Sequence, residues 1–182
     1  MTLYELLLFV HVAASIVWIG GAAMFQFMGL RVLARNQPGE LAEFAASVGR
    51  IGNTVLIGAA LTVLVAGFAL VWEGEFVKIG DDWIVIGLIL FAVTFLAGAA
   101  FFGPEGGRIG KLIQAQGVEA AQDRIRRLLV LTRLDLVLLF LIVFDMTVKP
   151  SFDEAGTLVI ALLVAAAFAA LITVPALRVR RA

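Results

Sequence analysis

The longest uncharged stretch of the sequence decides what kind of protein this chain can form. Residues 6–30, between Glu5 and Arg31, carry no charged side chain. About 20 apolar residues in a helix cross the hydrocarbon core of a bilayer, so this stretch is long enough for one span. The composition agrees, because 62% of the residues are hydrophobic and only 15% are charged, against about 45–50% and 25% in soluble domains. The sequence therefore predicts an integral membrane protein and excludes a soluble domain or a nucleic-acid-binding protein.

Apolar stretches at five places in the chain are long enough to be membrane spans. They cover residues 6–30, 51–72, 83–103, 128–148 and 156–177. Between the third and fourth stretches, Ile109, Leu112 and Ile113 stand among basic residues. Such a pattern is typical of a helix that lies on the membrane surface, and we expect a cytoplasmic interfacial helix over 108–127. The predicted fold is an all-α integral membrane protein, a five-transmembrane-helix bundle in one domain over 1–182.

The distribution of basic residues predicts the orientation of the bundle. Twelve of the 14 Lys and Arg lie in the first connection, in the third connection with Arg133 at its edge, and in the C-terminal tail. Connections that stay in the cytoplasm carry the excess of Lys and Arg. We therefore expect the N-terminus outside and the C-terminus in the cytoplasm, in a multi-pass protein of a cytoplasmic (inner) membrane.

Two polar groups are expected at similar depths in the outer half of the membrane. His11 lies about two turns into the first span, and Asp145 lies about one turn from the outer end of the fourth. Ionisable groups inside spans usually face the bundle interior and are functional candidates. If the first and fourth helices are neighbours, both side chains open into one outward-facing pocket, with Trp18 as its floor. The alternative is that His11 only packs against, and hydrogen-bonds to, a neighbouring helix.

The other charged groups of the fourth span have expected partners. Lys149 follows Asp145 by four residues, the spacing of a favourable helical ion pair, and we expect it to cap the pocket by pairing with Asp145 or Glu5. Arg133 is long enough to reach the lipid head groups. Asp135 is shorter, and we expect it to pair with a basic group on another helix.

A repeat of small residues marks one side of the fifth predicted span. Ala161, Ala165 and Ala169 stand four residues apart, and such a seam lets a neighbouring helix approach closely. The neighbour is either another helix of the bundle, which we favour, or another subunit.

Two segments resemble a group of small bacterial membrane proteins. Residues 9–35 read FVHVAASIVWIGGAAMFQFMGLRVLAR, and residues 133–150 read RLDLVLLFLIVFDMTVKP. Together they are similar to an uncharacterised family of predicted integral membrane proteins, to the HemJ-type protoporphyrinogen oxidases and to the CopD-type copper-resistance proteins. The resemblance to HemJ implies that His11 handles haem or porphyrin and that Lys149 matches the lysine of the terminal Lys-Pro. The further histidines of the HemJ pattern are missing here.

Three functions from different classes are compatible with these residues. The first is a haem-, porphyrin- or quinone-linked membrane protein, with haem b or a porphyrin as cofactor and His11 as the haem-iron ligand. Because the chain has one His, a second ligand would come from a dimer mate, water or a partner. The second is a non-catalytic structural or assembly subunit, in a homo-oligomer or a larger membrane complex. The third is a proton or ion pathway through Asp145, His11 and Asp135.

Overall fold

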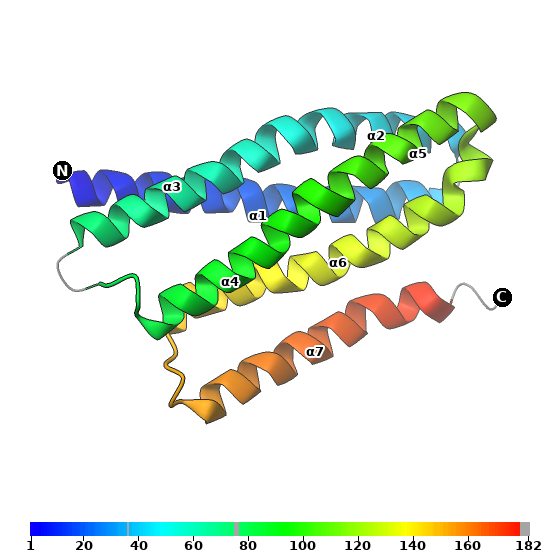
Figure 1. The fold of residues 1–182 in the computed structure, drawn as a ribbon. Helices are drawn as coiled ribbons and strands as arrows, with labels where there is room; N and C mark the ends of the chain where they lie inside the picture. The colour runs from blue at the N-terminus through cyan, green and yellow to red at the C-terminus, as the bar shows by residue number, and fades with distance from the viewer. Residues whose placement is uncertain (36, 75–76, 179–182) are drawn as a thin grey trace.

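The computed structural model describes residues 1–35, 37–74 and 77–178, and every regular element in these ranges is a helix (Figure 1). In chain order the elements are α1 (Leu3–Arg35), α2 (Pro38–Ile51), the π-helical turn η1 (Gly52–Leu56), α3 (Ile57–Glu73), α4 (Asp82–Leu96), the π-helical turn η2 (Ala97–Phe102), α5 (Gly103–Gln116), α6 (Val118–Val148) and α7 (Ala155–Arg178). The all-helical prediction is confirmed for this part of the chain.

The helices form a bundle of long arms: α1, the second arm α2–η1–α3, the third arm α4–η2–α5, and α6. α7 lies along the outside of this bundle (Figure 1). α1 packs along α3 and also against α6, and α4 packs against α6 as well. At the far end, α2 and α5 extend the second and third arms and contact each other. The main contacts of α7 are with α6, so α6 is the central helix of the molecule.

Two clusters of apolar side chains hold the arms together. The first takes a residue from every arm: Trp18, Ala60, Val63, Phe91, Leu139 and Ile142. The second lies at the other end, among α2, α5 and α6: Leu41, Ile109, Ala121, Ile125 and Leu129. Because each cluster joins segments that are distant in the sequence, burial of apolar surface fixes the order of the helices around α6.

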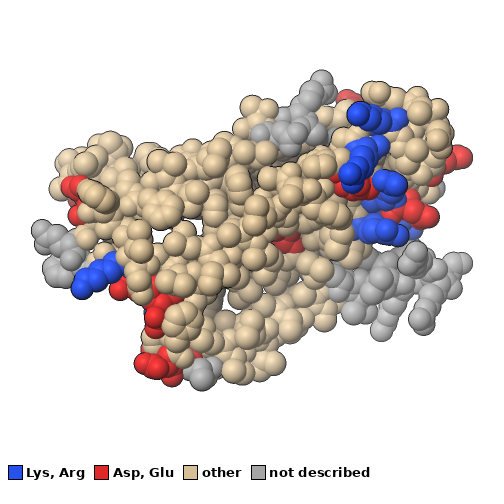
Figure 2. Space-filling view, in the orientation of Figure 1, with Lys and Arg blue, Asp and Glu red and all other residues tan. Residues whose placement is uncertain are grey.

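Among the residues that the structure describes, three helical stretches are long and apolar enough to cross a membrane: Leu3–Val32, Thr54–Glu73 and Asp82–Gln116. They contain most of the first three predicted spans. The described apolar stretch of α7, Gly156–Ala170, is shorter than these three. Uncharged side chains cover most of the middle of the molecule, and the blue Lys and Arg side chains gather mainly at one end (Figure 2). This distribution is that of a membrane protein with one strongly basic face.

The π-helical turn η2 keeps the third arm continuous across a proline. Pro104 has no N–H group, and its ring collides with the carbonyl four residues earlier in a regular α-helix. The wider turn ends at Phe102, and the chain continues directly into α5 as helix.

The segment predicted as one interfacial helix over 108–127 consists of two helices. α5 ends at Gln116 and α6 begins at Val118. Gly117 between them has a φ of 86°, a conformation that glycine adopts without steric cost. The chain reverses there, and α6 then runs without a break through the predicted fourth span.

The small residues of α7 lie on its less exposed side. Ala161, Ala165 and Ala169 are partly buried, whereas Val159 and Leu163 are 53% and 64% exposed. Since the main contacts of α7 are with α6, the seam faces the bundle of its own chain.

Candidate functional site

α1 and α6 are antiparallel neighbours, as the predicted pocket requires. The Gln26 amide donates from Nε2 to the Leu129 carbonyl at 2.7 Å, and the Thr132 hydroxyl donates to Gln26 Oε1 at 3.0 Å. His11 lies 15 residues before Gln26, and Asp145 lies 13 residues after Thr132. Both helices rise about 1.5 Å per residue, so His11 and Asp145 lie at about the same level of the bundle.

The imidazole of His11 is held by the backbone of α3. Its Nδ1 lies 2.9 Å from the Val63 carbonyl oxygen, and a carbonyl only accepts, so Nδ1 carries the proton and donates it. One turn further, Gly67 leaves room for the ring, because His11 Cε1 lies 3.2 Å from the point where a Cβ atom on Gly67 would stand. In the neutral ring, Nε2 is therefore the nitrogen with the free lone pair.

Asp145 is buried against α4. Its side chain is 2% exposed, and neither carboxylate oxygen has a hydrogen-bond partner. Oδ2 lies 2.9 Å from the point where a Cβ atom on Gly87 would stand, so only a glycine admits the carboxylate here. The direct hydrogen bond predicted between His11 and Asp145 is therefore not formed, and the bridge through one water stays a prediction.

Lys149 has a different partner from the two that the sequence suggests. It ends α6 in the left-handed conformation, with a φ of 52°, because the following Pro150 disfavours a helical residue before it. Its Nζ lies 4.8 Å from the centre of the Trp83 ring, within the range of a cation–π interaction. The predicted pairing with Asp145 is therefore wrong, and Glu5 lies beside the N-terminal amino group at 3.9 Å instead.

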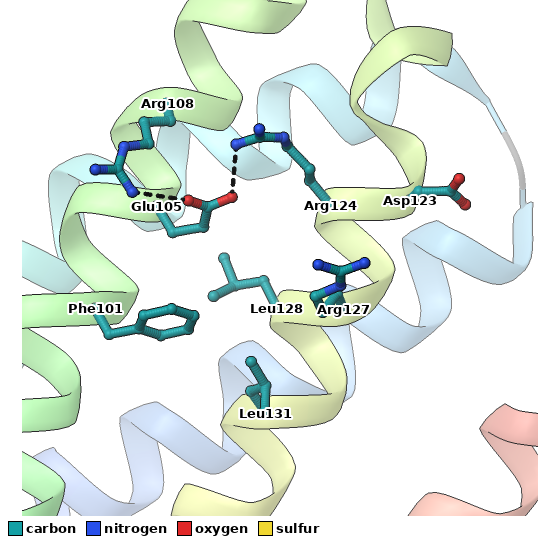
Figure 3. Close-up of a pocket in the computed structure, with 8 residues that line it drawn as sticks. All are labelled: Phe101, Glu105, Arg108, Asp123, Arg124, Arg127, Leu128 and Leu131. Carbon is teal, nitrogen blue, oxygen red and sulfur yellow. Dashed lines mark hydrogen bonds and ion pairs between the residues drawn. The ribbon is translucent and has the colours of Figure 1, made fainter.

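Trp18 belongs to the apolar core, two turns along α1 from His11. It is 8% exposed, and its ring meets that of Phe91 edge to face at 5.3 Å between centroids. The cavity shown in Figure 3 lies at the opposite end of the bundle, beside Glu105 and Arg124. The predicted role of Trp18 as the floor of an outward-facing pocket stays a prediction.

The two remaining charged groups of the fourth predicted span are also inside the bundle. Arg133 is 7% exposed, so the expectation that it reaches the head groups is wrong. The Oδ1 atom of Asp135 is buried without a hydrogen-bond partner, and Asp135 forms no ion pair within the described ranges. α6 thus carries two carboxylates with buried, unpartnered oxygens, ten residues apart in its C-terminal half.

Sequence reasoning missed three uncharged residues that position the side chains of His11 and Asp145. Gln26 is 7% exposed. Its side-chain amide binds α6 and fixes the position of α1 along α6. Gly67 and Gly87 are the gaps that admit His11 and Asp145. A signal for Gln26 exists, because an amide inside a long uncharged span needs hydrogen-bond partners within the protein. The sequence contains no such signal for Gly67 and Gly87, because only the packing distinguishes them from the other glycines of the spans.

The donor set of the site allows one kind of metal ligation. Among the residues that the structure describes, no three His, Cys, Asp or Glu side chains come together in a way that could hold a metal ion. A single neutral imidazole with its Nδ1 proton bound to a carbonyl is the usual arrangement of a metal-ligating histidine. His11 thus presents one imidazole nitrogen that is able to bind a metal, and within the described ranges no further His, Cys, Asp or Glu side chains complete a metal site around it.

Comparison with known proteins places the chain in a family. No curated protein and no solved structure matches it. The family model DUF2269, described as a predicted integral membrane protein, matches residues 5–150. The match includes His11, Asp145 and Lys149 and ends before α7 begins. Since it covers most of the chain, this protein belongs to the DUF2269 family of predicted integral membrane proteins.

Proposed function

We propose that this protein binds haem b or a porphyrin at His11, in the outer half of the membrane. The observation that carries the proposal is the hydrogen bond from His11 Nδ1 to the Val63 carbonyl, 2.9 Å long. It fixes the tautomer and directs the lone pair of Nε2 away from α3, as the second interaction of a ligating histidine does. A bound haem would supply redox chemistry, and His11 would hold it through Nε2.

The site belongs to a five-span protein with its N-terminus outside. The buried polar groups of α6 explain why its charge content exceeds that of an ordinary span, because charged residues inside a bundle face its interior. The basic face seen in Figure 2 supports a cytoplasmic location for the junction of α5 and α6. In this orientation His11 and Asp145 lie near the outer surface of a bacterial inner membrane.

The haem proposal is tested with the protein purified in detergent and titrated with haem b. We expect a Soret band with a saturable titration, and we expect His11→Ala to abolish it. Ser15→Ala is the matched control, because Ser15 lies one turn away and only donates to the His11 backbone carbonyl. A wild-type protein that stays colourless, or a His11→Ala variant that binds haem as the wild type does, would contradict the proposal.

A second candidate is an assembly subunit, and α7 favours it. Its outward side carries Ile160, Leu163 and Val164, which are 61–64% exposed, along a helix whose main contacts are with one other helix. We expect native mass spectrometry in mild detergent to find a complex heavier than one chain. Leu163→Trp should break that complex, whereas Val65→Trp, on the equally exposed face of α3, should not. A monomer mass would exclude this candidate.

A further inference from the structure

A cavity lies between the third arm and α6, at the end of the molecule opposite His11. Its volume is about 490 Å³. The cavity is lined by Phe101 of η2, by two residues of α5 and by five residues of α6 (Figure 3). The continuous helix through η2 and α5 forms one wall, and the first turns of α6 form the other. The function proposed for His11 does not involve this place.

The polar part of the cavity holds an excess of positive charge. The Glu105 side chain is 16% exposed and lies between two guanidinium groups, 3.3 Å from Arg108 and 3.0 Å from Arg124 (Figure 3). Both oxygens of this carboxylate are therefore occupied. Arg127 lines the same cavity and forms no ion pair within the described part of the chain. Asp123, the other acid of the lining, points away from Glu105 in Figure 3.

One side of the cavity is apolar. Phe101, Leu128 and Leu131 lie on the side toward the middle of the bundle (Figure 3). Phe101 is 46% exposed and belongs to the stretch Asp82–Gln116, which is apolar enough to cross a membrane. The cavity therefore runs from a group of arginines at one end to the apolar side chains of Phe101, Leu128 and Leu131 at the other.

We propose that this cavity binds an anionic phospholipid, with its phosphate group on the arginines and an acyl chain along Phe101 and Leu131. Guanidinium groups bind phosphate oxygens through paired, charge-assisted hydrogen bonds, and basic pockets between membrane helices recognise anionic head groups. The apolar wall favours a lipid over a soluble phosphate compound, because only a lipid covers Phe101. Glu105 holds Arg108 and Arg124 in place and limits the affinity by offsetting their charge.

Native mass spectrometry and thermal unfolding in neutral detergent test the proposal with three probes: phosphatidylglycerol, phosphatidylcholine and inorganic phosphate. We expect phosphatidylglycerol to bind and to raise the unfolding temperature more than the other two. Arg127→Gln should weaken phosphatidylglycerol binding by about tenfold, because it removes one charge-assisted interaction. Arg126→Gln is the matched control, since Arg126 is the adjacent exposed residue and does not line the cavity.

A second variant changes the affinity in the opposite direction. Glu105→Gln removes the charge that offsets Arg108 and Arg124, so phosphatidylglycerol binding should become tighter. Equal losses in Arg127→Gln and Arg126→Gln would overturn the proposal, as would phosphatidylcholine binding of equal strength. If inorganic phosphate stabilises the protein as much as phosphatidylglycerol does, the lipid is the wrong ligand. None of these outcomes depends on whether His11 binds haem.

Discussion

The imidazole of His11 lies 3.2 Å from the point where a Cβ atom on Gly67 would stand. This approach is what brings Nδ1 within 2.9 Å of the Val63 carbonyl, so the hydrogen bond and the missing side chain depend on each other. A change at Gly67 therefore acts on the candidate site without removing any polar group.

Gly67→Ala should push the ring away from α3 and lengthen the bond to Val63. An alanine in place of a glycine in a helix normally stabilises it by up to about 1 kcal/mol. Gly58→Ala, on the same arm with nothing within 4 Å of the new methyl group, should show that gain in thermal unfolding. Gly67→Ala should raise the unfolding temperature less than Gly58→Ala does, and it should shift any haem absorption band. Equal gains would mean that the ring tolerates the methyl group.

Gly87→Ala should destabilise the bundle. The new methyl group would stand 2.9 Å from Asp145 Oδ2 and 2.5 Å from Met146 Cε. Met146 is flexible, but the buried carboxylate has to move, and overpacking of this kind costs about 1–3 kcal/mol. Gly110→Ala on α5, where the methyl group meets nothing within 4 Å, is the control. Thermal unfolding in detergent measures the difference, and a Gly87→Ala variant as stable as the control would contradict the packing of Asp145.

Gln26→Ala should loosen α1 from α6. It leaves the Leu129 carbonyl and the Thr132 hydroxyl without the amide that joins them at 2.7 and 3.0 Å. Loss of a buried hydrogen-bond partner costs about 1–3 kcal/mol, which should appear as a lower unfolding temperature. Gln114→Ala removes an exposed amide and should change little. If Gln26→Ala also leaves the unfolding temperature nearly unchanged, the hydrogen bonds of Gln26 contribute nothing to stability.

Ala165→Leu should separate α7 from α6. Ala165 is partly buried on the seam side of α7, and a larger side chain there should cost about 1–3 kcal/mol. The neighbouring Ala166 is exposed, so Ala166→Leu should leave the unfolding temperature unchanged. If the two variants unfold alike, the seam faces lipid and not the bundle.

Reporter fusions test the proposed five-span topology and its orientation. Fusions after Arg35, Lys78, Arg127, Lys149 and the C-terminus should report inside, outside, inside, outside and inside in turn, because connections rich in Lys and Arg stay in the cytoplasm. The decisive position is Lys78, in a connection rich in acidic residues. A cytoplasmic signal there would reverse the orientation and would place His11 near the inner surface.

The helices could be predicted because an apolar run of membrane length has few other stable conformations. The exact ends of the helices could not be predicted, as Gly117 shows. The sequence between residues 108 and 127 is amphipathic throughout, whereas the reversal depends on one backbone angle of 86°. A glycine within an amphipathic segment is a signal for such a reversal, but only the packing of α5 against α6 decides whether the chain turns there.

The level of His11 and Asp145 could also be predicted, since it follows from helical rise and chain direction. Their partners could not. Asp145 faces Gly87 and His11 faces Gly67, and the choice of neighbour depends on the rotation of each helix, which uniformly apolar faces do not reveal. Lys149 has Trp83 as its partner because α6 ends at Val148, so that Lys149 leaves the helical conformation before Pro150.

The unbroken helix from Asp82 to Gln116 has a mechanical consequence. Its 35 residues span about 50 Å, whereas the hydrocarbon core is about 30 Å thick. Even a tilt of 40° leaves the rod about 10 Å too long for the core. The far end of α5 must therefore stand clear of the acyl chains as a short stalk. The exposed end of α5 continues the same arm as α4, which lies against Asp145. A change in the tilt of α4 therefore moves the exposed end of α5.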